Sequence, residues 1–463
     1  MSNPLVVTAQ GGGTTYSVFR LRAGLQKQLV ASVTQSPPGA DPNTFPINSV
    51  IQIGNRIIFL ANGIWQKTGA AAPVEVVSVA SLPGTNINRI GLFYTMLPAG
   101  PTIFGVSTGV NPARLYKYDY LTDVWSVTST GVNLSFSTVH SSVMVLNSVA
   151  YFVSSDRIIT IDPATATVVS SPVLTGYGDL TSYKGIIWAL RPLAIPTINQ
   201  YLGGVFSLAT AIIGGANSGF TQNHYCIYEK GGIIYGMCGG AANGNGWFMT
   251  AWDPVGLVAT DVTNTILAPA LRAGGSLSVG SGVDTTWRVY NWKYMDGATE
   301  RVFLTIFLGN ANAGAVVFEH VGSSMVLVNA SDWTTNLSIL QNDNSGDEYY
   351  WTEGELNAVQ TAQATPDTNG MKIPFYANGD AGTADSVVEL WYTVDGNGKY
   401  LQATIGVPTG GTGGASVIAG NVLTVVDANG DTGSPTQYNL LHDFAADGIS
   451  SSSGVRWKFV VRK

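Results

Sequence analysis

The sequence predicts an all-β protein made of short antiparallel strands. Runs of Val, Ile, Thr, Tyr and Trp recur along the 463 residues and are separated by Gly, Asn, Asp and Pro, as in strands joined by tight turns. Segments with a helical period and caps at both ends are almost absent, and the best candidates are 20–29 and 352–363. Similar segments also recur at regular intervals, which favours a fold of repeated small sheets.

The composition removes several classes of protein. Charged residues make up only 11% of the chain, against roughly 25% in an ordinary soluble protein. The chain has 11 Trp, 20 Tyr and 16 Phe, so it is not disordered. Its longest apolar stretches stop far short of the ~18 residues that span a membrane. With a net charge of −7 and scattered Lys and Arg, we expect neither nucleic acid nor membrane as a partner.

Two pairs of segments define the repeat. Arg114–Trp125 aligns without gaps on Arg157–Val168, and each matched pair of residues is 43 positions apart. Ser49–Leu60 aligns on Ser142–Val153 at an offset of 93, which equals two units of about 46 residues. A unit of this size that holds several short strands is typical of one four-stranded propeller blade.

The repeat carries its own turn chemistry. Asp119 is followed three residues later by Thr122, and Asp162 by Thr165, so side-chain oxygens are placed to hold the amides of a hairpin turn. Counting such units over 16–341 predicts about seven blades, with six as the alternative. Weaker copies of the pattern and two expected insertions complete the count: copies at 182–188, 228–235 and 317–322, and insertions at 199–220 and 239–247.

The strand, Asp-x-x-Thr and apolar order resembles the kelch-type propeller repeat. The paired glycine of that repeat is present as Gly231–Gly232 in one unit and is replaced by Asn147–Ser148 in another. This partial resemblance implies the architecture and assigns no functional residue.

A second domain is predicted after the polar cluster Asn342–Glu348. Ser386–Val394, the turn Asp395–Gly398 and Lys399–Ile405 together indicate a hairpin. Further strands are expected at Val422–Val426 and Val455–Val461. We therefore expect an N-terminal arm over 1–15, a propeller over 16–341 and a small β-sandwich-like domain over 342–463. The first residues have no basic and then apolar pattern, so no secretory signal is expected.

The residues that could do chemistry are few. Cys226 and Cys238 are expected to be buried free thiols, with a disulfide or a metal site as alternatives. The four histidines are scattered and are interpreted as structural or surface residues: His140, His224, His320 and His442. Gly105–Gly109 has the Gly-x-Ser-x-Gly pattern of a nucleophile elbow, but a Gly-rich loop is favoured because a strand follows instead of a helix.

The sequence contains only weak matches to the motifs of metal and phosphate sites. Asp427, Asn429 and Asp431 have the alternate spacing of a calcium loop, but Tyr438 stands where its bidentate Glu would be, so a plain turn is favoured over a metal site. Gly410–Gly414 is interpreted as a flexible loop and not as a phosphate cradle. We therefore predict no catalytic residue, no cofactor and no enzyme activity.

The predicted propeller with an appended β-domain, together with a composition rich in Gly, Ser, Thr and Asn, resembles the virion proteins of tailed bacteriophages. The resemblance is to the propeller-bearing tail hub or nozzle subunits in particular. The N-terminal segment Thr8–Thr15 is the small polar arm in this comparison. The resemblance implies a non-enzymatic structural component of the virion. Its partners would be other virion structural proteins and copies of itself in a homo-oligomeric ring, which would cover low-charge surface.

The main alternative is a carbohydrate-binding adhesin or receptor-binding fibre protein that contacts a host-surface glycan. Trp247, Trp252 and Trp333 are the candidates for stacking on sugar rings, although packing in the core or within a blade is favoured for each of them. Two further alternatives are a propeller glycosidase or lyase, which needs a carboxylate pair in a pocket, and an intracellular kelch-like adaptor. Ser281–Trp287 departs from the repeated hairpin of sugar-hydrolysing propellers.

Overall fold

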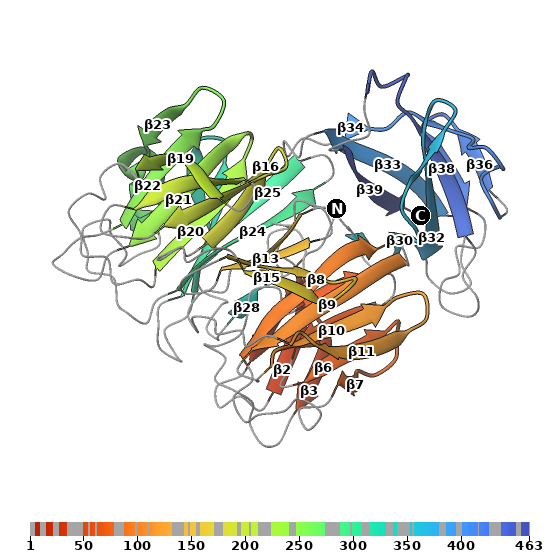
Figure 1. Cartoon of the computed structure of the whole chain (residues 1–463), viewed down its shortest axis with the longest axis horizontal. Helices are drawn as coiled ribbons and strands as arrows, with labels where there is room; N and C mark the ends of the chain where they lie inside the picture. Colours follow the sequence, from red (N-terminus) through yellow and green to blue (C-terminus); the bar gives the residue numbers. More distant parts are fainter. Residues whose placement is uncertain are drawn as a thin grey trace.

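The computed structural model shows a propeller of four-stranded antiparallel sheets followed by a β-sandwich (Figure 1). It describes residues 5–9, 15–21, 27–34, 50–53, 56–60, 63–77, 88–97, 100–108, 112–131, 143–146, 149–153, 158–170, 179–191, 196–202, 205–211, 224–239, 247–273, 288–296, 299–307, 315–329, 337–339, 352–353, 356–378, 386–394, 401–414, 416–425, 437–450 and 455–462.

The first blade joins the two ends of the propeller. Its sheet has the order β28-β1-β2-β3, with β28 at Leu337–Ile339, β1 at Leu5–Ala9, β2 at Thr15–Leu21 and β3 at Lys27–Thr34. Val7 pairs with Ser338 in antiparallel register. A strand from the far end of the propeller therefore closes the ring. The predicted N-terminal arm over 1–15 is wrong in this respect, because Leu5–Ala9 is a blade strand.

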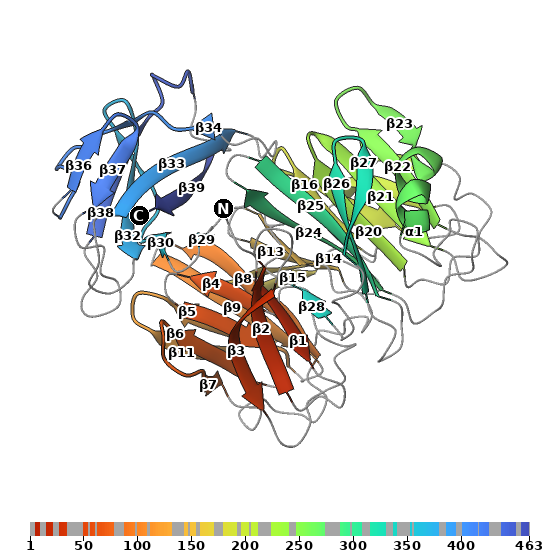
Figure 2. The same cartoon turned by 180° about the vertical axis from the view of Figure 1, so that it is seen from behind.

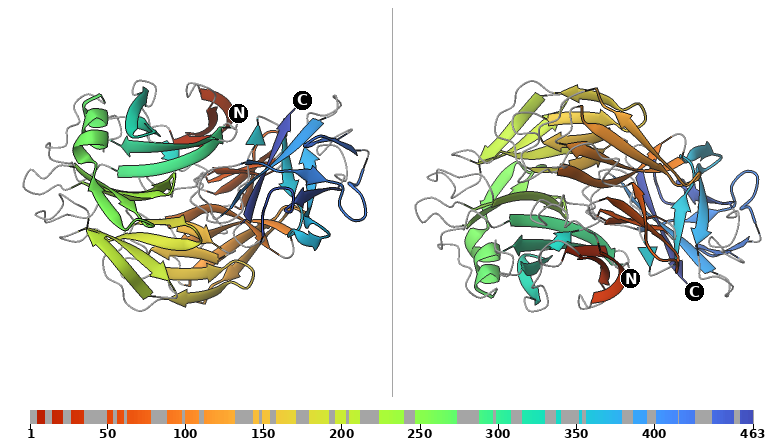
Figure 3. Two further views of the ribbon diagram at one scale, coloured as in Figure 1. Left: turned by 90° about the horizontal axis from the view of Figure 1, so that it is seen from above. Right: turned by 90° about the horizontal axis from the view of Figure 1, so that it is seen from below.

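Six further blades follow in chain order, so the part of the chain that the structure describes holds seven. Figure 3 shows them succeeding one another around the ring in the order of their colours. Their strands are β4 (Val50–Ile53), β5 (Arg56–Leu60), β6 (Ile64–Thr68) and β7 (Val74–Val77); β8 (Asn88–Leu97), β9 (Gly100–Thr108), β10 (Arg114–Asp119) and β11 (Val124–Ser129); β12 (Val143–Leu146), β13 (Val149–Val153), β14 (Ile158–Asp162) and β15 (Thr167–Ser170); β16 (Asp179–Tyr183), β17 (Ile186–Arg191), β18 (Thr197–Leu202) and β19 (Val205–Ala211); β20 (His224–Lys230), β21 (Ile233–Gly239), β22 (Trp247–Asp253) and β23 (Val258–Asp261); and β24 (Arg288–Asp296), β25 (Thr299–Phe307), β26 (Ala315–Val321) and β27 (Ser324–Asn329).

The repeats found in the sequence occupy equivalent places in their blades. Arg114–Trp125 and Arg157–Val168 cover the hairpins of the third and fourth strands of two adjacent blades. Ser49–Leu60 and Ser142–Val153 cover the hairpins of first and second strands two blades apart. The offset of 93 residues therefore does correspond to two blades, as predicted.

The core of the propeller lies between consecutive blades and not within one sheet. In β5, Ile57 and Phe59 pack toward the first blade, whereas Ile58 and Leu60 pack toward the third. Successive residues of a strand point to opposite faces, so a strand with a blade on each side has to be apolar at every position. This explains why the middle strands appear in the sequence as continuous apolar runs.

The Asp of the repeated hairpin holds its turn as expected. Asp119 Oδ1 accepts the N–H groups of Leu121 and Thr122 at 2.9 and 3.4 Å. Asp162 accepts the hydroxyl of Thr165 at 2.9 Å and the N–H of Ala164 at 2.8 Å. These bonds satisfy amides that the tight turn leaves without a strand partner.

A short helical segment extends the sixth blade. The π-helix η4 (Thr263–Leu267) continues into α1 (Ala268–Ala273) after β23. Ile266, Leu267 and Ala270 are buried in the cluster between the sixth and seventh blades. Figure 2 shows α1 beside β22 and β27. Helices were expected instead at 20–29 and 352–363, where the described residues form strands of β2, β3, β29 and β30, because pairing with neighbouring strands outweighs local helix preference.

The C-terminal domain is a sandwich of two antiparallel sheets around one core. One sheet has the order β29-β30-β32-β38-β35, with β31 paired to β32, and the other β34-β33-β37-β36, with β39 paired to β33. Both contribute to a shared cluster that includes Phe375, Leu440, Leu390 and Phe459. Their bounds are β29 (Thr352–Glu353), β30 (Leu356–Gln360), β31 (Thr365–Asp367), β32 (Gly370–Asn378), β33 (Ser386–Val394), β34 (Leu401–Gln402), β35 (Ile405–Gly406), β36 (Ser416–Ala419), β37 (Val422–Val425), β38 (Gln437–Asp443) and β39 (Val455–Arg462).

The structure corrects one prediction for the C-terminal domain and one for the propeller. The hairpin after Ser386–Val394 is shorter than expected, because Leu401 and Gln402 pair with β33 but Ile405 already pairs with β38 in the other sheet. The insertion predicted over 199–220 is wrong at its start, where 199–202 and 205–211 belong to β18 and β19. The predicted boundary at 342 lies outside the described residues.

Candidate functional site

A buried group of charges lies between the sixth and seventh blades in the part of the chain that the structure describes. Lys293 on β24 places its Nζ 3.2 Å from Glu229 Oε2 and 2.8 Å from Glu300 Oε1. The side chains of Lys293, Glu229 and Glu300 are only 6, 2 and 9% exposed. β20 and β24 are the first strands of adjacent blades, so the cluster joins the two blades through buried charge.

Neighbouring groups complete this buried cluster. Glu229 Oε1 accepts the N–H of Gly232 at 2.7 Å. Lys230 Nζ donates to the carbonyl oxygen of His320 on β26. His320 Nδ1 lies 3.0 Å from the hydroxyl of Tyr228, and its ring packs edge-on against Tyr235. Gly232 has φ +86°, so this turn requires the paired glycine noticed in the sequence.

Burial shifts the protonation equilibria of the cluster. Burial raises the pKa of Glu300 to about 7, opposed by the attraction of Lys293. Burial, reinforced by the positive charge of Lys230, lowers the pKa of His320 to about 3. A carboxyl group with a pKa near neutrality suits proton transfer, but the ammonium of Lys293 already occupies it. The arrangement therefore fits a buried ion pair that joins two blades better than a reaction centre.

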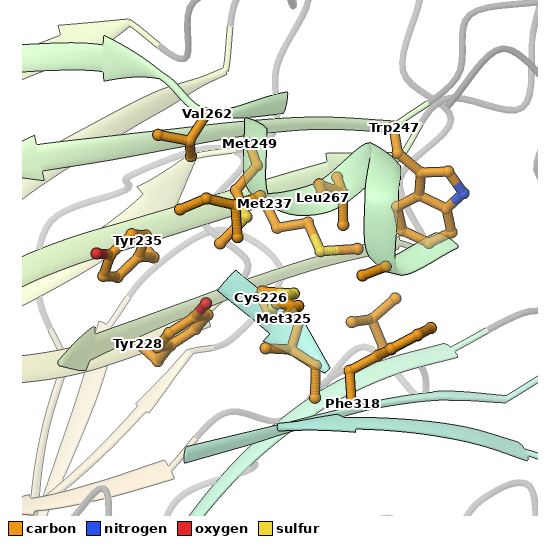
Figure 4. Packing of buried hydrophobic residues seen from close by; sticks show 14 of the residues in the cluster. Cys226, Tyr228, Tyr235, Met237, Trp247, Met249, Val262, Leu267, Phe318 and Met325 are labelled. Atoms are coloured by element: carbon orange, nitrogen blue, oxygen red, sulfur yellow. The ribbon is translucent and has the colours of Figure 1, made fainter. Parts of the chain in front are cut away.

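Apolar side chains continue the same interface, as Figure 4 shows. Met237 and Met249 from the sixth blade lie near Met325 of the seventh, with Leu267 of η4 among them. Flexible thioethers fill irregular space well, which suits a junction where two twisted sheets and a helix meet.

A second polar group is centred on His442 in the C-terminal core. Trp457 Nε1 donates to His442 Nδ1 at 2.8 Å, so the ring proton lies on Nε2, which donates to Asp447 Oδ2 at 2.8 Å. Asp447 also accepts the N–H and the hydroxyl of Thr404 at 2.9 and 2.6 Å. His442 is fully buried, and burial lowers its pKa. Every polar atom of this ring is already used by the protein.

The two cysteines are free and buried, as predicted. Cys226 belongs to the cluster between the sixth and seventh blades, whereas Cys238 belongs to the cluster between the fifth and sixth. The two thiols thus lie on opposite faces of one sheet, which excludes the alternative of a disulfide between them. Burial raises the pKa of both thiols.

Both thiols should therefore react very slowly with an aromatic disulfide reagent in the native protein, since the thiolate is the reactive form. Two equivalents per chain should react in denaturant without reductant, because both cysteines are free. Absorbance of the released thiolate measures both rates. Fast reaction of the native protein, or no reaction after unfolding, would contradict the buried free thiols.

The structure corrects the predicted glycan platform. Trp247 is 0% exposed and Trp252 is 5% exposed, and both pack in inter-blade clusters. A ring enclosed by apolar neighbours cannot stack on a sugar. Trp333 lies outside the described residues.

None of the remaining sequence motifs forms a cofactor or catalytic site in the described residues. Asp427, Asn429 and Asp431 lie outside the residues that the structure describes, and among those it does describe no group of three or more His, Cys, Asp or Glu could hold a metal ion. Ser107 of the Gly-x-Ser-x-Gly pattern lies in β9 and pairs with Arg114 of β10, so the described part of this segment, 105–108, is a strand and not the predicted loop. The turn at Gly410–Gly414 is held by hydrogen bonds, such as Asn439 N–H to Thr412 O at 2.7 Å.

The outer edge of the propeller is the most unusual surface in the described residues. The last strand of each blade exposes at least one aliphatic side chain by 50–62%: Leu29, Val74, Val124, Val169, Val205, Val258 and Val326. Four of these seven strands, β11, β15, β19 and β27, contain no charged residue. Natural edge strands usually carry charge or proline to prevent pairing with other chains. We call this surface the outer rim.

Sequence reasoning did not find the outer rim or the buried ion cluster. The charged or ionisable residues of the cluster come from three separate segments of the chain: Glu229 and Lys230 on β20, Lys293 and Glu300 on the hairpin of β24 and β25, and His320 on β26. One signal was present, since Glu229 follows the run Tyr225–Tyr228 and Lys293 lies between Trp292 and Tyr294, and a charge beside large apolar side chains in a strand needs a buried partner.

No protein-family model and no curated protein matches this sequence. Many solved structures show a likeness to it, including those of the following two proteins. Hsv2p of Kluyveromyces lactis is 10% identical, with a TM-score of 0.38 and coverage of 71% of this chain and 95% of that chain. A candidate 6-phosphogluconolactonase from Bacteroides uniformis is 10% identical, with a TM-score of 0.42 and coverage of 74% and 99%. No described helix is long and apolar enough to cross a membrane.

Proposed function

We propose that this protein is a non-enzymatic structural component of a virus particle, of the hub or nozzle type found in tails of bacteriophages. It would assemble with copies of itself and with neighbouring virion proteins. The observation that carries the proposal is the outer rim, where every blade exposes an aliphatic side chain on an edge strand and four of the seven strands lack charge. Such a surface is expected to be covered in an assembly.

The two polar clusters support the non-enzymatic part of the proposal. Lys293 is held between Glu229 and Glu300, and both nitrogens of His442 are engaged by Trp457 and Asp447. These groups stabilise contacts within the protein, and none is directed at an open site. Each of these charged groups is therefore paired within the fold.

The alternative, an adhesin that stacks glycans on tryptophan, is not carried forward. Two of its three candidate rings, Trp247 and Trp252, are buried. The proposal of a phage-tail protein in particular rests on the resemblance of the whole chain in amino-acid composition and domain order, with a propeller and an appended β-domain.

Mass spectrometry of purified particles tests the proposal. We expect the chain at a constant ratio to the other structural proteins of the particle after washing at high salt, because apolar edge contacts resist salt screening. Absence of the chain from the particles, together with a monomer at the highest soluble concentration, would contradict the proposed function.

A further inference from the structure

Among the seven outer strands, β11 is the one with no built-in protection against pairing. Four outer strands, β3, β7, β19 and β27, are interrupted by a shift in register against their neighbour. The outer strands β15 and β23 are only four residues long, and β23 ends in a charge at Asp261. Strand β11 runs over six residues, Val124–Ser129, without a shift, a charge or a proline. Bulges, short length and charge are the usual protections of an edge.

The side chains of β11 fit this interpretation. Val124 and Val127 are 55 and 44% exposed, and Leu121 in the preceding turn is 41% exposed. Trp125 is partly buried against the second blade, which fixes the strand in place. The edge is therefore ordered, uncharged and β-branched at the same time, and such a strand is ready to accept another strand.

The charges beside β11 favour a particular orientation of the partner. On β10, Arg114 stands opposite Ser129 and Lys117 opposite Ser126, whereas Asp119 stands opposite Val124. The blade edge therefore has a basic part and an acidic end, and Arg114 and Asp119 are about 17 Å apart. A second β11 that runs antiparallel brings the acidic end of one copy toward the basic part of the other. The two β10 strands are then three strand spacings, about 14 Å, apart, so their charges form no salt bridge and orient the approach only at low ionic strength.

We propose that β11 pairs edge to edge and antiparallel with β11 of a second copy of this chain, joining two blades into one continuous sheet. A two-fold axis perpendicular to the sheet generates this contact. The inference rests on the proposed function, because it names the partner and the place on the outer rim where self-assembly begins. A six-residue edge is a small interface, so we expect a dissociation constant of about 1 μM or weaker for the isolated pair.

Val127→Lys tests the contact, and Val258→Lys on β23 is the matched control, since both replace an exposed valine on an outer strand. Sedimentation velocity over a concentration series should show a dimer of the wild-type protein. Val127→Lys should weaken it by at least about tenfold and Val258→Lys should leave it unchanged. Hydrogen exchange gives a second readout, in which amides of Val124–Ser129 become protected as the wild-type concentration rises.

Three outcomes of these experiments test the pairing of β11 with a second copy. A wild-type dimer that only Val127→Lys weakens supports the inference. A dimer that both variants leave intact overturns pairing through β11, while self-assembly through another surface still agrees with the proposed function. A wild-type protein that stays monomeric overturns the inference, and the presence of the chain in particles then decides the proposed function separately.

Discussion

Replacing Lys293 with Met should lower the free energy of unfolding of the propeller by about 3–5 kcal/mol. The ammonium is the group that compensates two carboxylates, Glu229 and Glu300, both nearly inaccessible to water. Removing one partner of a buried ion pair leaves an uncompensated buried charge, which costs much more than an exposed pair contributes. Urea unfolding followed by hydrogen exchange of β20 and β24 measures the effect and separates it from the C-terminal domain.

The stability that Lys293→Met loses should depend on pH. The pKa of Glu300 is raised to about 7 in the folded protein, so this group binds its proton more tightly folded than unfolded. Its contribution to stability is fully present below the unfolded pKa of about 4.3 and is lost as pH rises to about 7. In the Lys293→Met protein, a protonated Glu300 avoids the uncompensated charge. The defect should therefore be smaller at pH 5 than at pH 8.

Two controls separate the ion pair from simple loss of a lysine. Lys67→Met removes a lysine that donates to the carbonyl oxygens of Gly69 and Ala71 near the surface, and it should cost about 1 kcal/mol or less. Adding Glu300→Gln to Lys293→Met should restore part of the lost stability. A Lys293→Met protein as stable as the Lys67→Met control would show that the cluster is not desolvated as described.

Local signals in the sequence predicted the local parts of the fold. The hairpins after Asp119 and Asp162 follow from turn chemistry within a few residues, and the structure contains both. The closure of the ring does not follow from any local signal, because Val7 pairs with Ser338 across almost the whole propeller. Pairing over such a distance depends on where six intervening blades place the two strands.

The same reasoning explains which site residues were missed. Any exposed tryptophan ring can stack on a sugar, but Trp247 and Trp252 are buried, and that burial depends on the neighbouring blade. Glu229 and Lys293 meet only because β20 and β24 are first strands of adjacent blades. Which strands lie at an edge is also decided by the fold. The sequence of β11 does not show that, among the described strands, only β10 pairs with it.

Below about pH 6.5 the C-terminal domain should lose stability through His442. The folded pKa of this histidine is lowered, first because burial penalises the imidazolium, although Asp447 and Asp443 partly offset this. A second ring proton on Nδ1 would face the indole N–H of Trp457, so two donors would oppose each other. A lowered pKa means that the unfolded chain binds more protons, so stability is present above about pH 6.5 and is lost as the pH falls. The slope cannot exceed about 1.4 kcal/mol per pH unit, which is the limit for one proton.

His442→Gln tests this, because an amide can still accept from Trp457 and donate to Asp447 but does not titrate. Its stability should vary less between pH 7 and pH 5 than that of the wild type, measured by hydrogen exchange of β38 and β39. The propeller supplies an internal control, since His320 has a pKa of about 3 and should give the same acid sensitivity in both proteins. Equal pH dependence of β38 and β39 in the two proteins would show that His442 does not control the acid response. The C-terminal sandwich would then owe its acid response to its carboxylates, in particular to Asp367, whose hydrogen bonds with Thr409 lower its pKa to about 2.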